Sequence, residues 1–130
     1  MTNQELIAKA KEAMTKAYAP YSHFQVGAAL LAKDGRVFTG CNVENATYGA
    51  TICAERTAVT KAVSEGVREF EKIAIVASSG DYTAPCGICR QVLFEFMPEG
   101  KVVLWSELGG EKEFALTDLL PFGFRGEDIK

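Results

Sequence analysis

The chain has 130 residues, of which 48% are hydrophobic and 24% charged, and this size and balance predict one globular domain spanning residues 1–130. Its net charge of −3 and pI near 5.2 argue against nucleic acid and anionic membranes as partners, because both attract proteins with a surplus of Lys and Arg. The N-terminal segment lacks the continuous apolar run of a signal peptide or membrane span, so we expect a cytoplasmic location.

The spacing of apolar residues predicts the elements of the first part of the chain. Apolar side chains recur at three- and four-residue steps over residues 6–18, which predicts an amphipathic helix that ends before Pro20. Residues 25–32 are almost continuously apolar and lead through an Asp-Gly turn into residues 36–40. This pattern is typical of a β-hairpin whose first strand is buried.

A second helix is predicted after the polar loop of residues 41–51. Apolar residues return at helical spacing from Ala54 onward and stop at Gly66, a residue type that commonly ends helices. Cys53 and Glu55 are therefore expected in the first turn of this helix.

The second half of the chain alternates strands with one more helix. Residues 72–79 predict a buried strand, and Pro85 is well placed to open a helix with Cys86 and Cys89 in its first turn. Residues 101–105 predict another buried strand, followed by a Gly-Gly turn and a last strand over residues 112–116 that is antiparallel to it. The element order predicts an α/β fold with three layers, α-β-α, in which helices cover both faces of a mixed five-stranded sheet.

Three of the four cysteines occur in two short motifs, each at the start of a predicted helix. The motif T-I-C-A-E-R contains Cys53 and Glu55, and P-C-G-I-C-R contains Cys86 and Cys89. Three thiols can thus converge on one point beside a carboxylate. Zn²⁺ binds thiolates tetrahedrally, and three protein ligands that leave the fourth position to water are typical of a catalytic zinc site.

A third thiolate leaves more negative charge on the zinc, which opposes the acidification of a bound water. The site therefore needs compensating positive potential, which two helix N-termini can supply. We also expect Arg56 and Arg90, each next to a motif residue, to donate hydrogen bonds to thiolate sulfur.

Further motifs resemble those of one enzyme family. In chain order they are F-Q-V-G-A-A-L at residues 24–30, G-C-N-V-E-N at 40–45, C-A-E-R-T-A at 53–58 and P-C-G-I-C-R-Q at 85–91. Together they are similar to the small homotetrameric cytidine deaminases, which are zinc-dependent nucleoside deaminases. The resemblance implies the reaction of pyrimidine salvage in which cytidine and 2′-deoxycytidine are hydrolysed to uridine and 2′-deoxyuridine plus ammonia.

The resemblance also implies the roles of the motif residues in that reaction. Cys53, Cys86 and Cys89 bind one zinc ion per chain, and a water acidified by the metal attacks C4 of the pyrimidine ring. Glu55 takes the proton of that water, delivers it to N3 and then helps the amino group to leave as ammonia.

Substrate contacts are implied for four further residues. Asn42 and Glu44 hydrogen-bond the ribose hydroxyls, and their alternate positions on an extended segment point them the same way. Phe24 packs against the pyrimidine face, and backbone groups of Ala54 help to fix the base.

Two aromatic residues are implied to act across subunits. Tyr48 and, in the C-terminal P-F-G-F-R-G segment, Phe124 would reach the pocket of a neighbouring subunit in a homotetramer.

Other interpretations stay open at this point. A Cys-x-x-Cys pair alone also fits a redox dithiol or a structural zinc knuckle. Cys41 as a fourth ligand would close the site and make the protein a zinc-stabilised interaction module without turnover. Deaminases of cytosine-containing antibiotics such as blasticidin S share the zinc motifs, but a substrate without the normal sugar has no use for Asn42 and Glu44 together.

Overall fold

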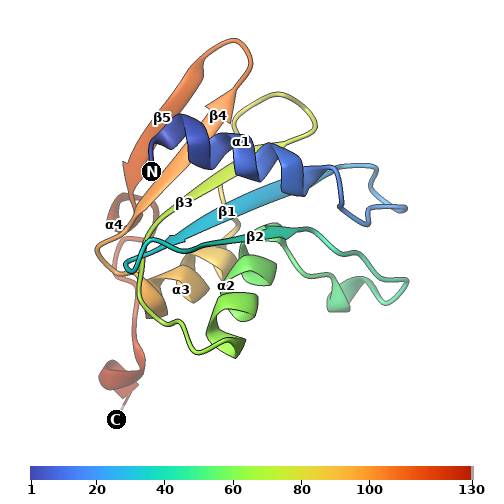
Figure 1. Cartoon of the computed structure of the whole chain (residues 1–130). Coiled ribbons are helices and arrows are strands. Elements are labelled where there is room, and N and C mark those ends of the chain that lie inside the picture. The colour runs from blue at the N-terminus through green and yellow to red at the C-terminus, as the bar shows by residue number, and fades with distance from the viewer. Residues whose placement is uncertain (130) are drawn as a thin grey trace.

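The computed structural model describes residues 1–129 (Figure 1). The elements are α1 (Asn3–Met14), β1 (Val26–Ala32), β2 (Val37–Cys41), α2 (Ala54–Ser64), β3 (Phe70–Ala77), α3 (Gly87–Phe96), β4 (Lys101–Ser106), β5 (Gly110–Ala115) and α4 (Leu116–Leu119). Short 3-10 turns lie at Tyr48–Ala50 and Gly126–Ile129. Within residues 1–129, no helix has both the length and the apolar composition needed to cross a membrane.

The strands form one mixed sheet in the order β2-β1-β3-β4-β5. β1 pairs antiparallel with β2 and with β3, β3 pairs parallel with β4, and β4 pairs antiparallel with β5. The predicted first hairpin and the antiparallel last strand are both confirmed. Because parallel strands cannot be joined by a tight turn, α3 makes the crossover from β3 to β4.

Helices cover both faces of this sheet because side chains of the central strands alternate between two apolar clusters. On β1, Ala28 and Leu30 pack in one cluster with residues of α2 and α3, whereas Ala29 and Leu31 pack in the other with residues of α1. Figure 1 shows α1 on one side of the sheet and α2 and α3 on the other. The predicted three-layer α-β-α architecture is therefore confirmed.

Most strand boundaries shift from the prediction by one or two residues, such as β3 at Phe70–Ala77 instead of 72–79. Two other differences have a clear structural reason. The first helix ends at Met14, because the backbone of Tyr18 is paired elsewhere: its N–H donates to the Asn42 carbonyl at 3.0 Å and its carbonyl accepts from the Glu44 N–H at 2.8 Å. The last strand ends at Ala115, and the turn of α4 that follows places Leu116 in the core.

Gly40 on β2 lets α2 approach the sheet closely. A Cβ atom at this position would lie 2.4 Å from the carbonyl oxygen of Ala54 and 2.6 Å from the backbone nitrogen of Ala58. Only a residue without a side chain fits there. This close approach fixes the start of α2, and with it Cys53 and Glu55, against one end of the sheet.

Candidate active site

The start of α2 and the start of α3 bring three thiols together. Cys53 is the N-cap of α2, Cys86 is the N-cap of α3, and Cys89 lies in the first turn of α3. Their Sγ atoms all lie within 4.8 Å of one another. A tetrahedral zinc with Zn–S bonds of about 2.3 Å needs sulfur atoms about 3.8 Å apart, so this soft donor set fits zinc with small adjustments.

Cys41 lies apart from this group. It ends β2 and is half-buried, and the three-thiol cluster found among residues 1–129 does not include it. The described cysteines are all free thiols. The closed four-cysteine site and a preformed disulfide therefore lack support.

Hydrogen bonds among the thiols stabilise negative charge before any metal binds. The Cys89 thiol and the Arg56 guanidinium both donate to Cys53 and lower its pKa, and Arg56 Nη2 lies 3.4 Å from the Cys53 sulfur. Donation to Cys53, together with burial, raises the pKa of Cys89. The Cys86 sulfur accepts the backbone N–H of Cys89 at 3.4 Å. The expected contact of Arg56 with thiolate sulfur is thus present.

Arg90 does not make the contact with sulfur that its position predicted. Its Nε donates to the carbonyl of Pro85 at 2.7 Å and its Nη1 to the carbonyl of Leu119 at 2.7 Å. The side chain runs back along α3 toward the segment before Cys86, so two carbonyls in the chain compete successfully with the thiolates for its donors.

Glu55 is buried beside the thiols. Its side chain extends from the first turn of α2 and is only 5% exposed. Burial raises the pKa of its carboxyl group, and the nearby charge of Cys53 acts in the same direction. A carboxylate with a raised pKa accepts a proton readily, which is the property a proton carrier needs.

A cavity of about 340 Å³ opens in front of Glu55 and the thiols. Its lining contains seven of the residues expected from the sequence, namely Phe24, Asn42, Glu44, Cys53, Ala54, Glu55 and Cys86. Cys89 is fully buried behind them. The expected metal, proton-transfer and substrate groups therefore meet at one cavity.

The Asn42 side chain holds the segment that carries Phe24. Its Oδ1 accepts the Val26 N–H at 2.9 Å, and its Nδ2 donates to the Phe24 carbonyl at 2.8 Å. One amide hydrogen and one lone pair remain free for a substrate. Asn42 therefore positions the aromatic residue in addition to lining the cavity.

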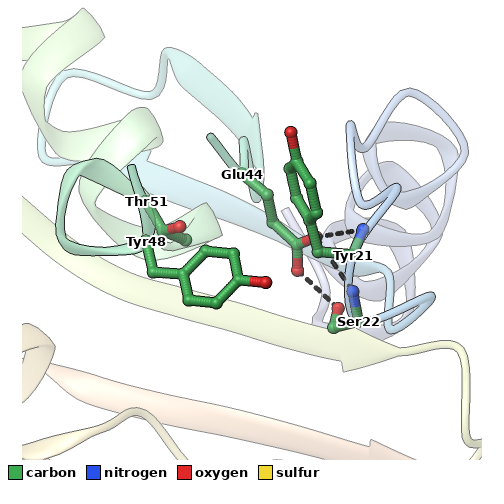
Figure 2. Close-up of a pocket in the computed structure, with 5 residues that line it drawn as sticks. All are labelled: Tyr21, Ser22, Glu44, Tyr48 and Thr51. Carbon is green, nitrogen blue, oxygen red and sulfur yellow. Dashed lines mark hydrogen bonds between the residues drawn. The ribbon is translucent and has the colours of Figure 1, made fainter. Parts of the chain in front are cut away.

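Glu44 is held in a similar way, by the residues just before Phe24 (Figure 2). Its Oε1 accepts the backbone N–H groups of Tyr21 and Ser22 at 3.0 and 3.1 Å, and its Oε2 accepts the Ser22 hydroxyl. The Ser22 hydroxyl lowers the pKa of the Glu44 carboxyl group, which therefore remains charged at neutral pH. The same hydroxyl oxygen accepts the Phe24 N–H at 3.0 Å.

Tyr48 lines a second cavity of about 310 Å³ that shares Ser22, Glu44 and Thr51 with the first. Figure 2 shows its ring across this cavity from Tyr21, and the two ring centroids are 5.7 Å apart in an edge-on arrangement. The Tyr48 side chain is 72% exposed. It does not line the cavity of its own Glu55.

Phe124 lies away from both cavities of its own chain. Its backbone pairs with the side chain of Gln91 on α3, and its side chain is 53% exposed.

Sequence reasoning missed five residues of the first cavity. They are Ser22, Val26, Thr51, Thr83 and Ala84. Four of them are small or hydroxyl-bearing residues of types common in loops, and Val26 begins β1, so their types alone indicate no role. Ser22 could have been found only from the position of Glu44, which is 22 residues away in sequence.

Replacement of a single thiol tests the proposed ligands. Cys86→Ala should reduce bound zinc from about one ion per chain to near zero, because two thiolates hold zinc poorly. Cys41→Ala is the matched control and should retain zinc. Elemental analysis of purified proteins measures both, and full zinc content in Cys86→Ala would contradict this ligand set.

Comparisons of the sequence and the structure with known proteins identify the family of this chain. The family model for the cytidine and deoxycytidylate deaminase zinc-binding region matches residues 1–105. Cytidine deaminase of Sporosarcina psychrophila is 49% identical over 99% of this chain and 96% of its own length, and that of Halalkalibacterium halodurans is 52% identical over 99% and 98%. The crystal structure of cytidine deaminase from Burkholderia pseudomallei superimposes with a TM-score of 0.90 at 51% identity, covering 95% of this chain and all of that one. The chain belongs to the cytidine deaminase family.

Proposed function

We propose that residues 1–130 form one catalytic unit that hydrolyses cytidine and 2′-deoxycytidine to uridine and 2′-deoxyuridine plus ammonia, in cytoplasmic pyrimidine salvage. The observation that carries the proposal is that a buried carboxylate, Glu55, and a cluster of three thiols meet at a cavity that Asn42 and Glu44 also line. Family membership and close relatives named cytidine deaminases support it.

Cys53, Cys86 and Cys89 would hold the zinc ion. When bound, zinc supplies a water acidified enough to act as nucleophile at neutral pH. Two helix N-termini and the Arg56 guanidinium offset the negative charge of the three thiolates, which would otherwise oppose that acidification. The chain itself thus contributes the positive potential that the ligand set lacks.

Glu55 moves the protons. Its carboxylate takes a proton from the attacking water and delivers it to N3 of the ring, which makes C4 more electrophilic. It then moves the proton of the new C4 hydroxyl group to the amino group, which leaves as ammonia while the C4 carbonyl of uridine forms. Burial supports this cycle because it brings the protonated and ionised forms of Glu55 closer in free energy.

Asn42 and Glu44 select a nucleoside. Each keeps hydrogen-bonding capacity facing the cavity, and an amide with a carboxylate matches the ribose hydroxyls. Phe24 supports the pyrimidine ring, and Ala54 at the start of α2 offers backbone groups to the base. An antibiotic without the normal sugar would leave this pair of polar residues unused.

Glu55→Gln tests the proton-transfer role. The amide keeps the shape but cannot cycle a proton, so kcat for cytidine should fall at least about 10³-fold while zinc stays bound. Loss of absorbance from cytidine measures turnover, and elemental analysis of the same sample measures zinc. Activity within about tenfold of the parent, or loss of the metal, would refute the assignment.

A substrate panel tests the nucleoside preference. The described lining of both cavities contains Glu44 and no Lys or Arg, so a 5′-phosphate would meet a negative charge without a cation to bind it. Cytidine should exceed cytosine in kcat/KM by about 10- to 10²-fold, since hydrogen bonds to charged groups contribute about 1.5–3 kcal/mol. 2′-Deoxycytidine should likewise exceed its 5′-monophosphate, because the phosphate would lie near Glu44 without a cation. Equal turnover of cytosine would contradict the assignment of Asn42 and Glu44, and equal turnover of the monophosphate would contradict the nucleoside preference.

We also propose a homotetramer whose active sites are completed by a neighbour. The exposure of Tyr48 and Phe124 supports this arrangement, as does the fact that neither is among the described lining residues of the cavity that holds Glu55 of their own chain. Light scattering should give a mass about four times the 14.1 kDa of one chain. Coexpressed Glu55→Gln and Phe124→Ala chains should recover activity that neither variant has alone. A stable, fully active monomer would refute the proposal.

A further inference from the structure

The first turn of α3 contacts the C-terminal segment as well as carrying two of the thiols. Arg90 follows Cys89 directly, and its Nη1 donates to the Leu119 carbonyl at 2.7 Å. Gln91 comes next and pairs with the backbone of Phe124, donating to its carbonyl at 2.5 Å and accepting its N–H at 3.5 Å. Consecutive residues of α3 thus hold both ends of segment 119–124.

Segment 119–124 lies tightly against α3. A Cβ at Gly123 would lie 2.6 Å from Leu120 Cδ2 and 3.1 Å from Phe94 Cδ2. Phe122, just before it, has a φ of +59° and a fully exposed side chain, so packing of its own ring does not hold the segment. Leu119 at its start packs against the core, and the hydrogen bonds from Arg90 and Gln91 add to that packing in placing the segment.

The Arg90 side chain also holds the peptide group that precedes Cys86. Its Nε donates to the Pro85 carbonyl at 2.7 Å. The carbonyl of Cys86 accepts the backbone N–H of Arg90 at 2.9 Å, which is an ordinary helical bond and does not depend on the side chain. Cys86 is the exposed thiol of the three, and its sulfur accepts a long bond from the backbone N–H of Cys89. The Arg90 side chain therefore fixes the backbone directly before the exposed thiol.

We propose that Arg90 is a positioning residue that couples zinc binding at Cys86 to the placement of segment 119–124. The proposal rests on the proposed zinc site. The planar guanidinium donates in two fixed directions at once, so the Pro85 and Leu119 carbonyls are held at a constant separation. Because coupling between two sites is reciprocal, bound zinc orders the segment, and an ordered segment strengthens zinc binding.

The test compares Arg90→Met with Arg68→Met. Met keeps much of the side-chain stem of Arg90 but leaves both carbonyls without a donor. Arg68 is exposed in the loop after α2 and serves as the matched control. Two quantities are measured on the full chain: the zinc dissociation constant, by competition with a chromophoric chelator, and amide hydrogen exchange of residues 119–126 with and without zinc.

Arg90→Met should weaken zinc binding about 10- to 100-fold, the usual effect of removing a group that orients a metal ligand. Zinc should slow amide exchange of residues 119–126, which include segment 119–124, in the parent and in Arg68→Met. This protection should be lost in Arg90→Met. Zinc affinity within about twofold of the parent, or retained protection of the segment, would overturn the proposal.

Arg90→Lys keeps the experiment decisive if Arg90→Met does not fold. One ammonium group cannot donate along both directions of the guanidinium, so zinc affinity should fall by at least about threefold together with the protection of the segment. Parent values for both would refute the coupling. A parent chain that binds no zinc refutes the proposed function first, whereas a zinc-binding parent with unaffected Arg90 variants refutes the coupling alone.

Discussion

The stabilisation of three thiolates by two converging helix N-termini is the interaction on which the rest of the site depends. Cys53 and Cys86 occupy N-cap positions, where backbone N–H groups and the helix dipole favour negative charge. This convergence requires α2 to lie close to β2, which the absence of a side chain at Gly40 allows. It also requires α3 to start after the loop of residues 78–86 that follows β3, within the connection that makes the parallel crossover to β4. The sheet topology therefore determines where α2 and α3 begin, and with them where the three thiols lie.

The cavity brings together two groups of residues. Glu55, Cys53 and Cys86 line it from the starts of α2 and α3. Asn42 and Glu44 also line it, and both are anchored to the residues around Phe24 that precede β1. In our account, recognition of the sugar and support of the base are thus mechanically linked. A substitution in this segment should affect both together.

Local sequence patterns predicted most of the fold, since apolar spacing defined the helices, the hairpin and the buried strands. The clustering of Cys53, Cys86 and Cys89 beside Glu55 could also be predicted, because these residues lie in two short motifs at helix starts. Contacts that depend on distant segments could not. Ser22 meets Glu44 only because Tyr18 pairs with residues 42–44, which also ends α1 early. For the same reason the partners of Arg90 were mispredicted: the Leu119 carbonyl that accepts its bond is 29 residues away.

Stepwise addition of zinc to the metal-free chain, with cytidine turnover followed by ultraviolet absorbance, tests the central claim most directly. The account predicts that activity rises in proportion to added zinc and reaches a plateau at about one ion per chain, because three thiolates with an open fourth position hold a single catalytic metal. Full turnover by the metal-free chain, or no turnover at any zinc content, would contradict it.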